Sequence, residues 1–321
     1  MDGVFAAAVL IPSPPVLVPE LSGGLPDRDP GHPAAQVPPL RAAVLAAGRE
    51  LAEAAVRWTV VGVADLGRAA DVVAAGRFGE PVGTGQDAGV VGAGRVAGVV
   101  GAGRVADVAR VDPVADAASP DRDGQAADAS YGPGTVGTFR GFGADVRAAL
   151  SDSALTGTMP ADPVVPLPIL IGGWLRGQVA PHATADARLI DAAATAEHCR
   201  AAGAALRCEL DADPAPRGVL IVADGAATLS TAAPGYLDER AAGVQERLDA
   251  ALSAGDRAGL AALDPALCAA LEISGRAAYQ VLAGLFDADP NVDTRYCAAP
   301  FGVGYHVSVW TEKNPGPASG S

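Results

Sequence analysis

The chain opens with an apolar run that predicts a buried strand. Residues 4–11 (VFAAAVLI) are apolar throughout and the run stops at Pro12. Such a run is typical of a strand that is buried on both faces of a parallel sheet. Leucine and valine then recur every three to four residues over 40–57, which predicts a helix, and 58–63 (WTVVGV) predicts a second buried strand. The order strand, helix, strand favours a βαβ unit.

The second half of the chain continues this alternation. In order, we predict a loop that leads into a short helix (166–176), a short strand (187–190), a helix with Asp191 as N-cap (191–206), a strand (217–222), three helical stretches (238–252, 256–263 and 265–286) and a late strand (303–310). The late strand alternates apolar and polar residues, which favours an antiparallel strand at the edge of the sheet. The sum is an α/β fold, with a mostly parallel central sheet flanked by helices.

A segment rich in glycine, alanine and aspartate separates the two halves, at about 79–133. Within it, 89–97 and 98–106 both read GVVGAGRVA. Two copies of this length are far shorter than a solenoid array, and the spacing G-x-G-x-x-x-G differs from the dinucleotide-binding pattern. We therefore predict a single domain over 1–313 that is interrupted by a disordered insertion, followed by a disordered tail over 314–321.

The composition of the chain disfavours several classes of function, among them nucleic-acid binding and membrane binding. The formal charge of −14 disfavours binding to nucleic acid or to an anionic membrane surface, because like charges repel. The chain has no apolar stretch of about 18 residues, so we expect no transmembrane helix. The N-terminal apolar run follows Asp2 rather than a basic residue and makes a poor signal peptide. The four cysteines form no C-x-x-C pair, which predicts free, buried or half-buried thiols in a reducing cytoplasm.

The candidate site lies where the predicted strands end. Ser13 sits in the turn Pro-Ser-Pro-Pro directly after the first strand, and proline rings hold that turn rigid. In open α/β sheets the functional crevice lies outside the carboxyl ends of the strands. We therefore expect one pocket to gather Ser13, Asp65 after the second strand, and the loop after 217–222 that carries Asp224 and Thr228.

An ordered set of segments resembles the LigB-like family of class III extradiol ring-cleavage dioxygenases, in its small actinobacterial-type branch. That family starts with a strand and a Pro-His-Pro-Pro turn, which AVLIPSPPVLVPE resembles. The matching segments are 8–20, 131–143 (YGPGTVGTFRGFG), 167–175 (LPILIGGWL), 223–240, 263–282 and 301–310 (FGVGYHVSVW). They cover most of the chain outside the insertion. The resemblance implies a LigB-like α/β fold and, in active members, Fe(II) held by two histidines and a carboxylate.

The chain departs from the family pattern at the positions that the resemblance assigns to chemistry. Ser13 replaces the first ligand histidine, and Asp65 is the one candidate ligand after the second strand. The place of the acid/base histidine reads Ala-Ala-Thr over 226–228. The region that supplies the carboxylate holds both Gln280 and Glu272, and the resemblance does not choose between them.

The four histidines lie far apart in the sequence, so they form no local metal pair. We expect His32 to be solvent-exposed, His182 to lie in a loop and His198 to be half-exposed on a helix. His306 has apolar neighbours on one face of the late strand and is interpreted as structural, with a metal-ligand role as the alternative.

These patterns favour a degenerate, non-catalytic LigB-like protein without a cofactor. Its role would be structural or regulatory, in a homo- or hetero-oligomer, or the binding of a small aromatic or other small molecule. The alternative is an active Fe(II)-dependent ring-cleavage dioxygenase, an oxidoreductase whose ligands are brought together by the fold. Its candidate ligands are Asp65, Glu20, Asp224, Glu272 and the histidines. Hydrolysis by Ser13 is disfavoured, because the sequence shows no adjacent base and no G-x-S-x-G elbow.

Overall fold

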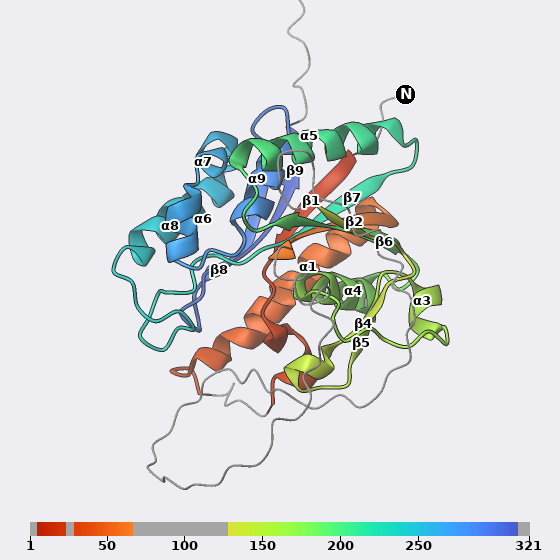
Figure 1. Cartoon of the computed structure of the whole chain (residues 1–321), viewed down its shortest axis with the longest axis horizontal. Helices are drawn as coiled ribbons and strands as arrows, with labels where there is room; N and C mark the ends of the chain where they lie inside the picture. Colours follow the sequence, from red (N-terminus) through yellow and green to blue (C-terminus); the bar gives the residue numbers. More distant parts are fainter. Residues whose placement is uncertain (1–4, 24–28, 67–127, 314–321) are drawn as a thin grey trace, which may run out of the picture.

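A seven-stranded mixed sheet forms the centre of the computed structural model, which describes residues 5–23, 29–66 and 128–313 (Figure 1). The strand order is β3-β6-β2-β7-β1-β9-β8. The strands β6, β2, β7 and β1 run parallel, and the outer three pair antiparallel with their neighbours. The bounds are β1 (Phe5–Ile11), β2 (Arg57–Ala64), β3 (Ala129–Tyr131), β6 (Thr184–Asp191), β7 (Arg217–Val222), β8 (Asn291–Ala298) and β9 (Tyr305–Thr311).

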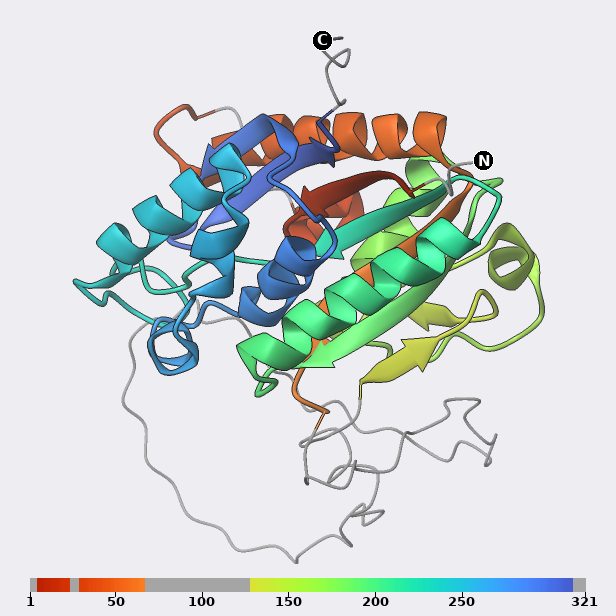
Figure 2. The same cartoon turned by 90° about the horizontal axis from the view of Figure 1, so that it is seen from above.

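Helices cover both faces of this sheet (Figure 2). One face carries α1 (Val37–Ala54) and α4 (Leu167–Val179), and the other carries α5 (Ala196–Ala212), α6 (Ala241–Ala254) and α9 (Arg276–Gly284). The shorter elements are α3 (Asp152–Thr156), α7 (Arg257–Ala261), α8 (Pro265–Ala270) and a two-stranded sheet of β4 (Val136–Thr138) and β5 (Arg147–Ala149). Because the middle strands are covered on both sides, their residues are apolar almost throughout.

Two glycines let α5 and α9 touch along their backbones. A Cβ atom at Gly203 would lie 2.2 Å from the carbonyl oxygen of Val281, and one at Gly284 would lie 2.3 Å from that of Arg200. No side chain fits at these distances, so this crossing requires glycine at both positions. The contact holds the second half of α9 against α5.

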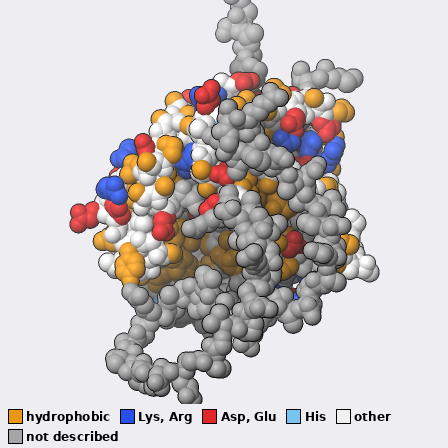
Figure 3. All heavy atoms as spheres, viewed as in Figure 1, with side chains coloured by type: hydrophobic (Ala, Val, Ile, Leu, Met, Phe, Trp, Pro, Cys, Tyr) orange, Lys and Arg blue, Asp and Glu red, His pale blue; other side chains and the backbone are white. Residues whose placement is uncertain are grey.

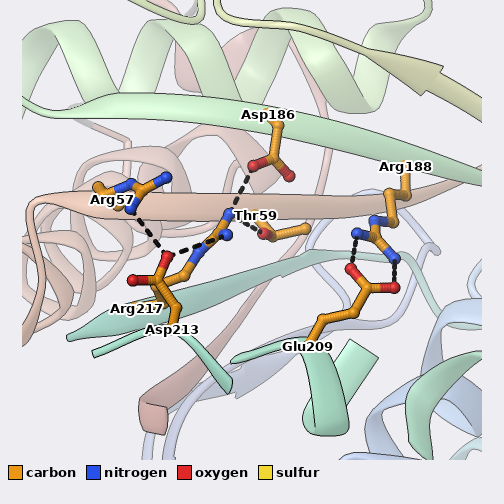
Figure 4. Close-up of polar contacts among 7 residues, drawn as sticks. All are labelled: Arg57, Thr59, Asp186, Arg188, Glu209, Asp213 and Arg217. Carbon is orange, nitrogen blue, oxygen red and sulfur yellow. Dashed lines mark hydrogen bonds and ion pairs between the residues drawn. The ribbon is translucent and has the colours of Figure 1, made fainter. Parts of the chain in front are cut away.

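Ion pairs fasten the amino-terminal ends of the parallel strands (Figure 4). Arg217 at the start of β7 donates to Asp186 on β6 at 2.6 Å and to Thr59 on β2 at 3.3 Å. Arg57 at the start of β2 donates to Asp213 at 2.8 Å. Arginines and acids are therefore matched across three strands at this edge, which lies opposite the carboxyl ends of the same strands.

Arg and acidic side chains also alternate over the outer surface. In Figure 3, blue and red side chains lie next to one another over the upper and left parts of the visible face.

Within the described residues, none of the helices is both long enough and apolar enough to cross a membrane.

The structure confirms the α/β architecture with a mostly parallel centre, and it corrects several elements. The predicted insertion is too long at its C-terminal end, because 129–131 form β3 and pair with β6. Asp191 does not cap a helix: it ends β6, and α5 begins five residues later with Thr195 as its N-cap. The reason is that Asp191 continues the ladder with Ala64 on β2 before the chain turns.

Two further predictions fail near the C-terminus. The stretch 265–286 is not one helix, because α8 ends at Ala270 and a turn separates it from α9. The late strand β9 is antiparallel as predicted but is not at the edge, since β8 pairs with its outer side. β8 escaped prediction because its residues are largely exposed and polar. The tandem repeat and the tail lie outside the described residues.

Candidate functional site

Ser13 and Asp224 meet at the carboxyl ends of two neighbouring parallel strands. The register of β1 and β7 sets Ile11 beside Val222, so each of the two residues follows two positions after that pair. The backbone N–H of Ser13 donates to Oδ1 of Asp224 at 2.8 Å, and the Ser13 hydroxyl donates to Oδ2. Ser13 and Asp224, two of the four residues expected in one pocket, are therefore in direct contact.

A cleft of about 390 Å³ opens beside Asp224. Its walls come from the segments that follow β6 and β7, from α8, from the first turn of α9 and from Val303 ahead of β9. Most lining side chains are small and apolar. Among the described residues, the charged side chains on the cleft are Asp224, Glu272 and Arg276. A cleft of this size, largely apolar with a few charged groups, is typical of a small-molecule site.

Burial dominates the electrostatics of Asp224. The residue keeps some surface on the cleft, but its carboxyl group is surrounded by protein, and this burial raises its pKa above the usual range. The two hydrogen bonds from Ser13 act in the opposite direction. Within the described residues, no arginine, lysine or histidine pairs with this carboxyl. Its charge also adds to the effect of burial in raising the pKa of Tyr305, the first residue of β9.

Arg276 is the cation of the cleft, and sequence analysis missed it. Its side chain is 4% exposed. It donates to the carbonyl oxygens of Ala192 at 2.7 Å and Ala194 at 2.8 Å, and to Oε1 of Gln280 at 2.8 Å. These acceptors are all neutral. The sequence does contain a signal for this residue, since one arginine stands inside the apolar stretch ISGRAAYQVL. An arginine that is buried in such a stretch needs several hydrogen-bond acceptors around it.

Glu272 lies on the rim of the same cleft, in the turn between α8 and α9. Its φ of +52° is unusual for a residue with a side chain. Its carboxyl lies close to Gly235, where a Cβ atom would come within 2.6 Å of both Cδ and Oε2. Of the two residues in the region where the resemblance expects a carboxylate, Glu272 lies on the cleft. Gln280 is fully buried and binds Arg276 and the carbonyls of Ala261 and Leu263.

A buried glutamine holds the loop after β7 in place. Oε1 of Gln245 on α6 accepts from the N–H of Ala226 at 2.8 Å, and its Nε2 donates to Asp249 at 2.8 Å. A Cβ atom at Gly225 or at Gly304 would lie 2.4 Å from this amide. Gln245 on α6 therefore holds in place the loop that carries Asp224.

Of the four predicted pocket residues, Asp224 lines the cleft and Ser13, Thr228 and Asp65 do not. Thr228 is 3% exposed, and its hydroxyl donates to the carbonyl of Leu271 at 3.3 Å, so it ties the loop to the end of α8. Asp65 follows β2 at the same edge of the sheet, but it is exposed and β7 separates its strand from β1. Neither residue lines the cleft. The expected convergence of Ser13 with Asp65 and Thr228 is therefore not what the structure shows.

His306 is held within the fold away from this cleft. It is 2% exposed, and its Nε2 lies 3.2 Å from the hydroxyl of Ser253 on α6. Burial lowers its pKa to about 4. His182 lies in the turn between α4 and β6, as predicted, and is exposed. His198 is half-exposed on α5, also as predicted, and lies 3.0 Å from Asp128. His32 is half-buried rather than exposed, because its Nδ1 accepts from the N–H of Ala34.

The cysteines follow the prediction in part. All four are free, and Cys199 and Cys268 are buried. Cys208 and Cys297 are exposed, contrary to the prediction, because they lie on the outer face of α5 and on β8. Cys268 lines the cleft; burial raises its pKa to about 11, although the nearby charge of Arg276 lowers it.

The Fe(II) centre implied by the LigB-like resemblance does not fit the side chains at this edge. The position of the first histidine holds a hydroxyl that is already committed to Asp224. His306, the histidine offered as a ligand, points to Ser253. Across the described residues, no three histidine, cysteine or acidic side chains are grouped so as to hold a metal ion. The two-histidine, one-carboxylate set is therefore not assembled from these residues.

Comparison with known proteins gave no match, either to a protein-family model or to a curated protein.

Proposed function

We propose that the protein is a LigB-like binding protein that holds a small organic molecule in the cleft beside Asp224, without iron-dependent ring cleavage. The observation that carries the proposal is the Ser13–Asp224 pair at the carboxyl ends of β1 and β7. In the family that the chain resembles, this turn supplies a metal-binding histidine. Here the same position supplies two hydrogen-bond donors that orient a carboxylate toward a ligand-sized cleft.

The geometry supports binding more than attack by Ser13. The serine is 9% exposed, it is not among the residues that line the cleft, and its hydroxyl proton points to Asp224. A nucleophile must reach the reacting atom of the substrate. Ser13 is therefore placed to hold Asp224, whereas Asp224 is placed to accept a hydrogen bond from a bound molecule. A role as the binding subunit of a larger assembly is compatible with this arrangement.

A thermal-shift series tests the proposal. The compounds are catechol, 3-methylbutylamine, 4-methylpentanoate and L-leucine, each added to the full chain and to Asp224→Asn. A ligand that binds the native state raises the melting temperature. We expect at least one compound to raise it for the wild type and to have a much smaller effect on the variant. The proposal is wrong if none of them acts, or if every shift survives in Asp224→Asn.

A further inference from the structure

The cleft carries two buried charges of opposite sign that do not pair with each other. Asp224 is bound by the neutral N–H and O–H groups of Ser13, and Arg276 donates to neutral oxygens. No ion pair joins Arg276 to an acid within the described part of the chain. Elsewhere, the arginines at the amino-terminal edge of the sheet are matched by aspartates (Figure 4). Arg176, outside the cleft, is likewise buried on neutral carbonyl oxygens, but on the cleft itself both Arg276 and Asp224 lack a charged partner among the described residues.

The positive side of the cleft is built from Arg276 and the start of α9. Three neutral acceptors hold the guanidinium, and its charge is felt by Cys268 on the cleft wall. α9 has nine residues and begins at Arg276, and its N-cap Gly275 offers no side chain to the free N–H groups of the first turn. Ser274 and Ala277 of this region line the cleft. The N-terminal end of a helix favours a negative group, and a buried guanidinium does so more strongly.

The negative side is built from Asp224 and Glu272. Both oxygens of Asp224 accept from Ser13, and each carboxylate oxygen has room for a further donor. Glu272 is exposed on the rim and forms no hydrogen bond through its carboxyl within the described residues, while Gly235 leaves space for that group. Two carboxylates on one cleft favour a cationic donor group.

Leaving a charge buried without a counter-charge is unfavourable, and a ligand of the opposite charge removes that cost. A ligand with one charge would match one side and leave the other unmatched. A molecule that carries both an ammonium and a carboxylate group matches both sides at once.

We propose that the cleft binds a small zwitterion, in the class of free α-amino acids, with its carboxylate toward Arg276 and the first turn of α9 and its ammonium group toward Asp224 and Glu272. This inference rests on the proposed function and names the class of molecule. The remaining lining is apolar and includes Ala227, Pro265, Ile273 and Val303. An apolar side chain therefore fits between the two polar ends, and the volume of about 390 Å³ is ample for an amino acid.

Calorimetric titration of the full chain with three matched compounds tests the class. L-leucine carries both charges, 4-methylpentanoate lacks the ammonium group, and 3-methylbutylamine lacks the carboxylate. We expect leucine to bind at least about tenfold more tightly than either analogue, because each charged hydrogen bond that is lost leaves a buried group unmatched. Equal affinity for leucine and one analogue would overturn the zwitterion assignment, as would the absence of leucine binding.

Variants assign the two ends. Asp224→Asn and Glu272→Gln should each weaken leucine binding by about tenfold or more and leave the affinity for 4-methylpentanoate little changed. Asp145→Asn is the matched control, since it removes a carboxylate whose partner, Arg140, lies on the exposed surface. Loss of leucine binding in the control, or an equal loss for both compounds in Asp224→Asn, would contradict the assignment.

The outcomes separate this inference from the proposed function. If catechol binds in an Asp224-dependent way and leucine does not, the cleft is a binding site but the zwitterion class is wrong. If none of the compounds binds, both proposals fail.

Discussion

The hydroxyl and the backbone N–H of Ser13 both donate to the carboxylate of Asp224, although 211 residues separate the two in the sequence. The pairing exists because β1 and β7 are parallel neighbours in register, so their carboxyl ends are level. It converts the turn after the first strand into a support for a buried acid, and the proposed binding function depends on that support.

Ser13→Ala should weaken this support. The variant removes the hydroxyl donor and leaves Asp224 with the backbone N–H of residue 13 alone. A hydrogen bond to a charged group contributes about 1.5–3 kcal/mol, so we expect a loss of that order in the free energy of unfolding at neutral pH, measured by urea denaturation. The pKa of Asp224 should also rise further. Thr135→Ala, which removes an exposed hydroxyl bonded to a carbonyl, is the control, and an equal loss there would argue against a special role for Ser13.

Asp224 should make stability depend on pH in a defined direction. Its pKa is raised in the folded state, chiefly by burial, so between the ordinary carboxyl value of about 4 and the folded value the native state binds more protons than the unfolded state. In that window, stability increases as the pH falls. Comparison with Asp224→Asn at pH 7 and pH 4.5 should therefore show the wild type gaining relative to the variant at the lower pH. A difference that is independent of pH would contradict the buried carboxyl.

His306 should act in the opposite sense. Burial lowers its pKa from 6.5 to about 4, so the unfolded chain takes up a proton at a pH where the folded chain does not. The free energy of unfolding should fall as the pH drops from about 6.5 toward 4, by up to about 1.4 kcal/mol per pH unit. His306→Gln should lose this dependence and His182→Gln, at an exposed position, should keep it. Identical pH profiles for the wild type and His306→Gln would contradict the burial of His306.

The crossing of α5 and α9 gives a prediction about packing. Gly203→Ala places a methyl group 2.2 Å from a backbone carbonyl, and we expect it to reduce the free energy of unfolding by about 1–3 kcal/mol or more. Gly177→Ala on α4 is matched, because a Cβ atom there meets nothing within 4 Å. That variant should be stabilised by about 0.5–1 kcal/mol through its helix propensity. A similar effect of both substitutions would argue against backbone contact between the two helices.

The sequence predicted the elements whose apolar residues follow a strong periodicity. It did not predict features that depend on contacts between segments far apart in the chain. The apolar runs of β1, β2 and β7 predicted the parallel core, and the place of Ser13 after the first strand predicted its nearness to the loop that carries Asp224. Polar β8 gave no such signal, because it depends on its pairing with β9. Arg276 was missed for the same reason: two of its three acceptors, the carbonyls of Ala192 and Ala194, lie on a loop more than 80 residues away. Asp65 was overestimated, since position at the end of a strand does not say which strands are neighbours.

Iron retention tests the central claim most directly. The full chain is incubated with Fe(II) without oxygen and desalted, and the iron per chain is then measured by mass spectrometry. Because Ser13 engages Asp224 and His306 engages Ser253, we expect no stoichiometric iron to remain and no ring cleavage of catechol when oxygen is admitted. About one tightly held iron per chain, with cleavage of catechol, would contradict the account and establish an active dioxygenase.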